Sequence, residues 1–315
     1  MSPTSHAAPS ADAGLQEFQR HRPRLFGLAY RMLGQRAEAE DVVQDVWLRW
    51  QDSGRAAIAQ PEAWLVTTAT RLAIDRLRRL RVEREHYAGF WLPEPLVQPW
   101  TEAAPSSEEL LERAHDVSTA LLFVLEQLTP EERAAFLLRE VFDADYAEVA
   151  QALGRSEAAC RQLVHRARAH VKAGRPRFDA PAEAHAELLR RFAQAVQGGD
   201  LAQIQALFAP DAALISDGGG KVPSFGRVLE TGRRLALLYF ATARRLRRDG
   251  QVQTLHLVRV NGLPGLLRCV DGQVESVQTL LVENGLVQRV YTLRNPDKLA
   301  GVAVPAAQPI GLQNR

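Results

Sequence analysis

One stretch near the middle of the chain constrains the fold most, because it predicts two helices joined by a short turn. The first helix runs into Gly154, a residue type that readily takes the left-handed conformation that ends helices, and Ser156 is a suitable cap for the next helix. Along the second helix apolar residues recur at helical spacing, which predicts one buried face. The pattern therefore predicts a helix-turn-helix over residues 145–168. The buried positions are Cys160, Val164, Ala167 and Val171.

The opposite face of the second helix is basic. From Arg161 to Phe178 there are six Lys or Arg residues and no acid. A helix packed on one side, with cationic and amide donors on the other, is typical of a recognition helix. A basic face that is simply exposed to water would give the same pattern. The rest of the chain must therefore decide whether this helix binds DNA. The candidate DNA contacts are Arg161, Gln162, His165, Arg166 and Arg168, with Ser156 as a phosphate contact.

Composition bounds the function classes only loosely. The 315 residues suffice for two or three domains, and the net charge of +2 means that a nucleic-acid partner must be argued from local patches. Cys160 and Cys269 lack metal-ligand spacing, which favours a cytoplasmic protein without a metal or cofactor. No apolar run approaches membrane-spanning length, so no membrane partner is expected. Residues 1–14 read as a disordered tail rather than a signal peptide.

Helical periodicity also dominates a first helical block, residues 15–87. One helix is expected between Gly34 and Gly54, with Asp41 and Asp45 one turn apart on an acidic face. Pro61 suits the first turn of the next helix, which is rich in arginine. Each of these charged faces could also be simply exposed to water, without a binding role. Two separated basic helices on one chain nevertheless suit a protein that touches DNA at two places.

A linker, residues 88–108, follows the first block. Its four prolines exclude a continuous helix and keep the chain extended. It also holds large apolar residues that are costly to leave in water, so part of it is expected to pack on a domain surface. A second helical block, residues 109–173, contains a capping box at Thr129–Glu132 and ends with the helix-turn-helix. The apolar linker residues are Phe90, Trp91, Leu92, Leu96 and Trp100.

The third domain, residues 182–300, changes class. Two helices, the second ending near Pro210, are expected before a strand over 212–216 and a helix over 228–246. An antiparallel meander then follows, with a hairpin turn at Asn284-Gly285. Helices followed by such a meander indicate an α+β domain, and residues after Gly301 are expected to form a loose tail. The four meander strands are expected over 252–260, 266–270, 274–283 and 286–293.

The order of these parts resembles the extracytoplasmic-function sigma factors. Residues 39–50 (AEDVVQDVWLRW), 61–65 (PEAWL) and 73–79 (AIDRLRR) resemble sigma domain two. Residues 128–133 (LTPEER), the helix-turn-helix and 165–168 (HRAR) resemble sigma domain four. Three further segments, 91–95 (WLPEP), 217–221 (DGGGK) and 295–299 (NPDKL), resemble hallmarks of a subgroup with a fused SnoaL-like domain. The implied fold is two all-α sigma domains followed by an α+β cone of the nuclear-transport-factor type.

The resemblance implies a protein that binds core RNA polymerase and directs promoter-specific transcription initiation. The acidic helix of domain two is expected to dock on the clamp helices of the largest bacterial subunit, which implicates Asp41, Gln44, Asp45 and Arg49. The loop over 52–60 and the next helix are expected to melt and read the minus-ten element of the promoter. The recognition helix is expected to read the minus-thirty-five element. Many relatives carry Asn where Thr70 stands. The residues implied for the minus-ten element are Trp64, Thr67, Thr70, Arg71, Asp75 and Arg78. Taken alone, Trp64 is more simply read as a core tryptophan.

Two hypotheses remain for the third domain. Either it regulates the sigma domains in place of a separate anti-sigma protein and is no enzyme, or it binds a small-molecule ligand or retains acid–base catalysis. The nearest acid–base candidates are Asp217, His256, Cys269 and Asp271, and for these a structural role is the simpler reading.

The regulatory hypothesis predicts a contact between segments 91–95 and 217–221. The glycines of segment 217–221 suit a loop that approaches another surface closely. The residues expected to carry the interdomain regulation are Trp91, Leu92, Pro93, Glu94, Pro95, Asp217, Gly218, Gly219, Gly220, Lys221, Asn295, Pro296, Asp297, Lys298 and Leu299.

Overall fold

The computed structural model describes residues 11–54, 58–101, 118–174 and 182–311, and the chain divides into two compact units. The first unit comprises Met1–Glu83, Pro105–His115 and Val124–Gly174, and the second comprises Arg84–Ala104, Asp116–Phe123 and Arg175–Arg315. Six predicted features fall wholly or partly outside the described residues. They are the N-terminal tail, the centre of the 52–60 loop, the end of the first linker, the start of the second helical block, the linker before the third domain and the end of the C-terminal tail. The domain limits drawn from the sequence stay a prediction.

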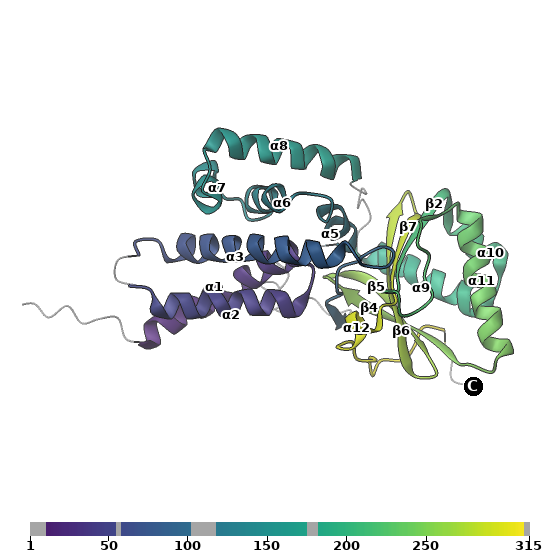
Figure 1. The fold of residues 1–315 in the computed structure, drawn as a ribbon. Helices are drawn as coiled ribbons and strands as arrows, with labels where there is room; N and C mark the ends of the chain where they lie inside the picture. The colour runs from purple at the N-terminus through teal and green to yellow at the C-terminus, as the bar shows by residue number, and fades with distance from the viewer. Residues whose placement is uncertain (1–10, 55–57, 102–117, 175–181, 312–315) are drawn as a thin grey trace, which may run out of the picture. The chain divides into compact units, whose positions relative to one another are not determined.

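The first helical block folds as three helices, α1 (Ala11–Leu33), α2 (Arg36–Asp52) and α3 (Pro61–Arg84) (Figure 1). The predicted starts after Gly34 and at Pro61 are confirmed. Apolar residues three and four apart give each helix one face to bury. None of the described helices combines the length and apolar character needed to cross a membrane.

The second helical block contains α5 (Thr119–Leu125), α6 (Pro130–Phe136), a π-helical turn η3 (Leu137–Val141), α7 (Tyr146–Leu153) and α8 (Glu157–Gly174). The predicted capping box is confirmed, because the Glu132 amide donates to Thr129 Oγ1 at 3.2 Å and the Thr129 amide donates to Glu132 Oε2 at 3.1 Å. The helix-turn-helix is confirmed as well. Gly154 ends α7 with φ +62°, and Ser156 Oγ accepts the Ala159 amide at 3.3 Å.

The second unit is built on a seven-stranded sheet in the order β1-β4-β5-β6-β7-β2-β3. The predicted antiparallel meander is confirmed for β4 to β7, and Asn284 and Gly285 have the positive φ angles of the expected turn. The sequence made no prediction for the pairing of β2, which runs parallel to β7. The strands are β1 (Val97–Pro99), β2 (Phe208–Asp217), β3 (Leu229–Glu230), β4 (Gln253–Val260), β5 (Leu263–Val270), β6 (Gln273–Glu283) and β7 (Leu286–Leu293).

Helices cover one face of this sheet. Those helices are α9 (Ala182–Gly198), α10 (Leu201–Ala206) and α11 (Gly232–Arg248) (Figure 1). They share a core with the sheet, and in that core the rings of Phe192 and Tyr239 meet edge to face with their centroids 4.9 Å apart. A second core contains apolar residues of the linker and of α12 (Pro296–Leu299). The linker is thus an integral part of the second unit.

Three details differ from the sequence-based expectations. Pro210 lies in β2 at an irregularity of register, where a bulge tolerates a residue without an amide hydrogen. The linker does not only pack on a surface: β1 pairs Val97 with Val260 of β4 and extends the sheet. The expected loose tail after Gly301 is wrong at Ile310, whose amide donates to Leu255 O at 2.7 Å and whose side chain packs on the core.

Candidate DNA-binding faces, docking face and linker contact

The recognition helix α8 has the two faces that the sequence predicts. Its apolar stripe is buried and is joined by Leu163. The candidate DNA contacts Arg161, Gln162, His165, Arg166 and Arg168 are all exposed, as is Ser156 in the preceding turn. The packed stripe fixes the helix, so the exposed side chains are presented from a rigid element.

Three arginines of this face are bonded to carboxylates. Arg161 bonds Glu157 at 2.7 Å, Arg166 bonds Glu132 at 2.8 Å and Arg168 bonds Glu140 at 2.6 Å. Burial alone would raise the pKa of Glu132, but the hydrogen bonds from Arg166 and Thr129 outweigh it and lower that pKa. A DNA phosphate at this face would replace a carboxylate that already holds the guanidinium group.

The candidate minus-ten residues of α3 are engaged by the second helical block. Arg71 Nε donates to Ala152 O at 3.0 Å, and its Nη2 donates to Gln151 O at 2.8 Å, so one guanidinium group caps the C-terminal end of α7. Arg78 bonds Asp75 at 3.0 Å and also bonds Glu131 of α6. Within the first unit, the arginine-rich face of α3 is therefore held against α6 and α7.

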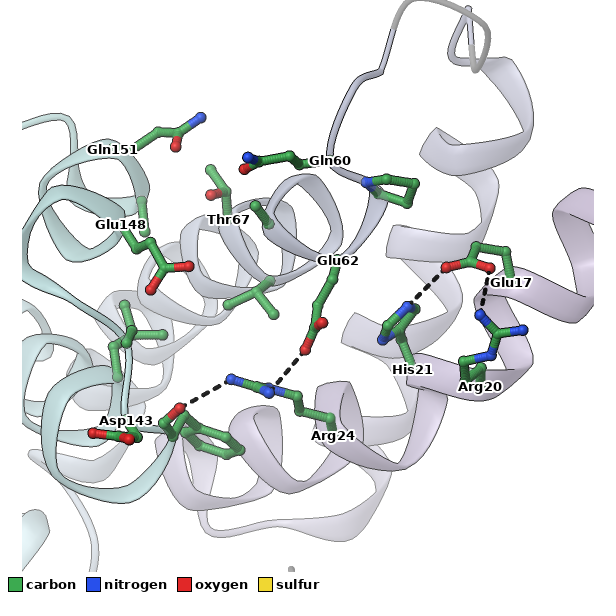
Figure 2. A pocket seen from close by; sticks show the side chains of 17 residues that line it. Glu17, Arg20, His21, Arg24, Gln60, Glu62, Thr67, Asp143, Glu148 and Gln151 are labelled. Carbon is green, nitrogen blue, oxygen red and sulfur yellow. Dashed lines mark hydrogen bonds and ion pairs between the residues drawn. The ribbon is translucent and has the colours of Figure 1, made fainter.

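An open pocket of about 890 Å³ lies between these two blocks (Figure 2). Gln60 and Thr67 line it from the start of α3, and Glu148 and Gln151 line it from α7. Arg24 of α1 crosses it, bonding Glu62 at 2.8 Å and Phe142 O at 3.0 Å. Among the described residues no group of His, Cys, Asp and Glu side chains is arranged to hold a metal ion. The pocket thus lies between α1 and the start of α3 on one side and the turn and helix α7 of the second helical block on the other.

Two candidate minus-ten residues have less exposed side chains than the sequence suggests. Thr70 is fully buried and donates to Val66 O at 2.7 Å, a bond within its own helix. Its side chain does not reach the surface, so Thr70 is withdrawn as a DNA contact. Trp64 is half-buried, with its ring 5.5 Å from that of Trp50, and keeps part of its surface for a base.

The acidic face of α2 is exposed at Asp41, Gln44 and Arg49, and Asp45 is half-buried. Asp41 is not a simple solvated charge, because it bonds Arg76 of α3, which also bonds Glu38. The sequence analysis missed Leu48, whose side chain is 49% exposed on the same face. Its position four residues after Gln44, outside the buried stripe of α2, is the signal that identifies it.

Asp217 at the end of β2 is the centre of a buried polar cluster in the second unit. Its carboxylate accepts hydrogen bonds from Tyr87 Oη at 2.5 Å, the Leu92 amide at 2.9 Å, the Gly219 amide at 2.9 Å and Lys298 Nζ at 2.8 Å. The predicted contact between segments 91–95 and 217–221 is thereby confirmed. We call Tyr87, Leu92, Asp217, Asn295 and Lys298 the Asp217 cluster.

Lys298 ties the linker to α12. Its ammonium group donates to Leu92 O at 2.6 Å and lies 4.1 Å from the centre of the Trp91 ring. Tyr87, which the sequence analysis missed, accepts a hydrogen bond from Asn295 Nδ2 at 2.8 Å. Burial and the hydrogen bond to Asp217 raise the pKa of Tyr87, which keeps its hydroxyl a donor. An isolated tyrosine before the linker carries no pattern that reveals this role.

The remaining members of the three hallmark segments are packed or exposed according to their place. Pro93, Pro95 and Leu299 are buried, Glu94 is half-buried, and Pro296 is exposed. Lys221 and Asp297 form an exposed ion pair at 2.6 Å.

The glycines of segment 217–221 approach other backbone and side chains closely, as predicted. Gly219 has φ +62°, and a Cβ atom there would lie 2.4 Å from Asn295 Nδ2. At Gly218 a Cβ would lie 2.4 Å from Val222 O, and Gly220 has φ +70° beside Ala88. Only glycine fits Gly219 without displacing the Asp217 cluster.

The four acid–base candidates of the third domain have structural partners, and His256 and Cys269 share one of them, Thr254. Asp217 belongs to its cluster, and Asp271 accepts the Val252 amide at 2.8 Å in a turn. His256 contacts Thr254 Oγ1 at 3.2 Å, and burial lowers its pKa, whereas burial raises the pKa of the Cys269 thiol. A hollow in this part of the structure, beside His185 and Tyr291, measures about 10 Å³. These contacts favour structural roles over an acid–base pair.

Comparisons with known proteins agree with this arrangement. Sigma-70 region 2 matches residues 18–82, and Sigma-70, region 4 matches residues 118–171. The chain is 37% identical over 311 residues to the ECF RNA polymerase sigma factor SigJ of Mycobacterium tuberculosis (strain ATCC 25618 / H37Rv), covering 94% of this chain and 97% of that protein. A probable ECF RNA polymerase sigma factor of the same strain, SigI, is 29% identical, with 89% and 92% covered. The crystal structure of M. tuberculosis SigJ matches with a TM-score of 0.72 at 35% identity, covering 91% of this chain and 98% of that chain. The similarity therefore extends through the third domain.

Proposed function

Since this chain belongs to the extracytoplasmic-function sigma factors of RNA polymerase, it is an alternative sigma factor that directs transcription initiation, and we propose how its parts share that function. Two helical sigma domains precede an α+β SnoaL-like domain. The exposed face of α2 docks on core polymerase, α3 reads the minus-ten element and α8 reads the minus-thirty-five element. The docking face consists of Asp41, Gln44, Asp45, Leu48 and Arg49.

The contacts of Arg71 support a closed state of the sigma domains in the uncomplexed protein. Its guanidinium group cannot reach a promoter base while it caps α7 through two carbonyls. Core polymerase or promoter DNA would favour an open state through its greater affinity for that state. The minus-ten set that remains after Thr70 is withdrawn consists of Trp64, Thr67, Arg71, Asp75 and Arg78.

The third domain acts on promoter output in cis, without catalysis. The observation that carries this proposal is the Asp217 cluster, in which the linker between the sigma domains is bonded to a loop and a helix of the third domain. A linker held in this way has fewer conformations, and the spacing of the two DNA-reading domains depends on it. No ligand is needed for this effect.

Transcription by core polymerase with and without the full chain tests the proposal, with transcripts sequenced to locate their start sites. We expect new transcripts from a common pair of promoter elements. Trp91→Ala, which removes the ring beside Lys298, should change their amount. Trp100→Ala, which removes the ring beside Arg259, is the matched control and should not. An equal effect of both variants, or no effect of either, would contradict regulation through the cluster.

A further inference from the structure

The outer face of α11 carries an array of arginines that the promoter-reading domains do not account for. The helix contains six arginines and no acidic residue. Its inner face is buried in the core of the third domain, which holds the helix in place. At 100° per residue, Arg233 and Arg244 lie within about 20° of each other around the helix axis. The arginines are Arg233, Arg234, Arg244, Arg245, Arg247 and Arg248.

Within the described part of the chain, only two of these six arginines, Arg245 and Arg248, form ion pairs. Arg247 donates to Gln197 O, and Arg245 and Arg248 share Asp249 at 3.6 Å and 3.0 Å. For Arg233, Arg234 and Arg244, the described part of the chain supplies no carboxylate within ion-pair distance. Because the whole chain has a net charge of only +2, this positive charge is a local concentration and not a general property of the surface.

The chemistry of this face fits a polyanion of regular spacing. Guanidinium groups bind phosphates with two parallel hydrogen bonds, and they are the common choice for nucleic-acid backbones. Arg233 and Arg244 are separated by about 17 Å along the axis, enough to reach phosphates on both sides of a major groove about 12 Å wide. Because arginine is also enriched at protein interfaces, affinity for core polymerase is measured as a separate outcome of the test.

We propose that the outer face of α11 binds the phosphate backbone of duplex DNA without reading its sequence. It thereby adds a third DNA contact to those of α3 and α8. Leu237, which is 43% exposed between Arg233 and Arg244, would lie against the sugar edge of the duplex. The proposal does not depend on which residues of α3 and α8 read the promoter.

The salt dependence of DNA binding by the holoenzyme tests this contact. In R233A/R244A, the slope of log affinity against log salt should fall by about 2, because each lost phosphate contact releases one fewer counterion. The affinities for promoter duplex and for an unrelated duplex should fall by the same factor. The matched control is R227A/R289A, which removes the same charge from two exposed arginines, one of them on the sheet face opposite to α11.

Three results would overturn the proposal: an unchanged slope, an equal change in the control, or a loss confined to affinity for core polymerase, which would assign the face to an acidic protein surface. A second measurement does not depend on affinity. L237C carrying a photo-crosslinker should label DNA strands, whereas the two native cysteines are buried, and burial raises the pKa of both thiols. Absence of labelled DNA from a complex that forms normally would also overturn it.

Discussion

Lys298 Nζ lies 2.8 Å from Asp217 Oδ2, and the two side chains are only 9% and 0% exposed. A buried ion pair is tolerated when hydrogen bonds satisfy the remaining polar atoms of both partners. Here Tyr87, two backbone amides and the Leu92 carbonyl supply those bonds. The pair therefore joins three segments that are far apart in the sequence, and its loss should be felt in all of them.

Asp217→Asn should strongly destabilise the second unit. Removing one partner of a buried ion pair leaves the other charge uncompensated, which costs about 3–5 kcal/mol. Asp297→Asn, which breaks the exposed pair with Lys221, should cost about 0–1 kcal/mol. Calorimetric unfolding of the full chain measures both, and similar losses of stability would show that the cluster is not the stabilising centre inferred above.

Gly219→Ala should disrupt the linker contact more than its backbone strain alone predicts. An alanine at positive φ costs about 1–2 kcal/mol, and the new Cβ would in addition displace Asn295. Gly272→Ala is the matched control, because φ there is +77° but nothing lies within 4 Å of the added Cβ. Denaturant unfolding of both variants should show a larger loss at Gly219, and equal losses would contradict the close-approach argument.

Alanine substitutions on α8 should separate base reading from phosphate binding. Gln162→Ala should relax preference at one base pair, at a cost in discrimination of about 1–3 kcal/mol. Arg168→Ala should weaken binding to all sequences alike and reduce the salt slope by about 1. Competition binding of the holoenzyme to single-base variants of a promoter distinguishes the two. If neither variant changes promoter affinity or preference, α8 is not the recognition helix.

Leu48→Ala should weaken binding to core polymerase by roughly fivefold. Burying about half of a leucine side chain in an interface is worth on the order of 1 kcal/mol, and hot positions exceed that value. Val82→Ala, at another exposed apolar position on α3, should leave that affinity unchanged. Titration of core polymerase with labelled protein measures both.

For the charged residues of the docking face, Asp45 is the better target for charge reversal, because a positive charge at Asp41 would repel Arg76 within the same block.

Acid should loosen the second helical block through Glu132. Its folded-state pKa is lowered, so the ionised carboxylate contributes stability above its usual pKa, and this contribution is lost as the pH falls through the folded value. Glu132→Gln should remove this part of the pH dependence, together with the bond to Arg166. Unfolding of both proteins between pH 7 and pH 3 provides the test, and parallel pH profiles would exclude Glu132 as the source.

Local sequence was sufficient for the helices and for the close backbone approach of segment 217–221. Apolar periodicity defines the buried stripe of α8, and the short-range bonds of Gly154, Ser156 and Thr129 define where helices begin and end. The three successive glycines of segment 217–221 predicted that its backbone approaches another surface closely, because such a run has little other structural use. Each of these features depends on residues a few positions apart, which is the range over which a sequence pattern carries information.

Only the tertiary structure decided which distant segments pair. Nothing in the apolar pattern of β2 shows that it runs parallel to β7, because side-chain alternation is the same in both directions. The sequence pattern likewise does not show that β1 pairs with β4, that Tyr87 and Lys298 bond the same carboxylate, or that Arg71 caps the end of α7. In the unfolded chain these polar groups bond to water instead. The bonds between them therefore contribute to stability only in the folded chain, where the packing of the intervening segments brings the partners together.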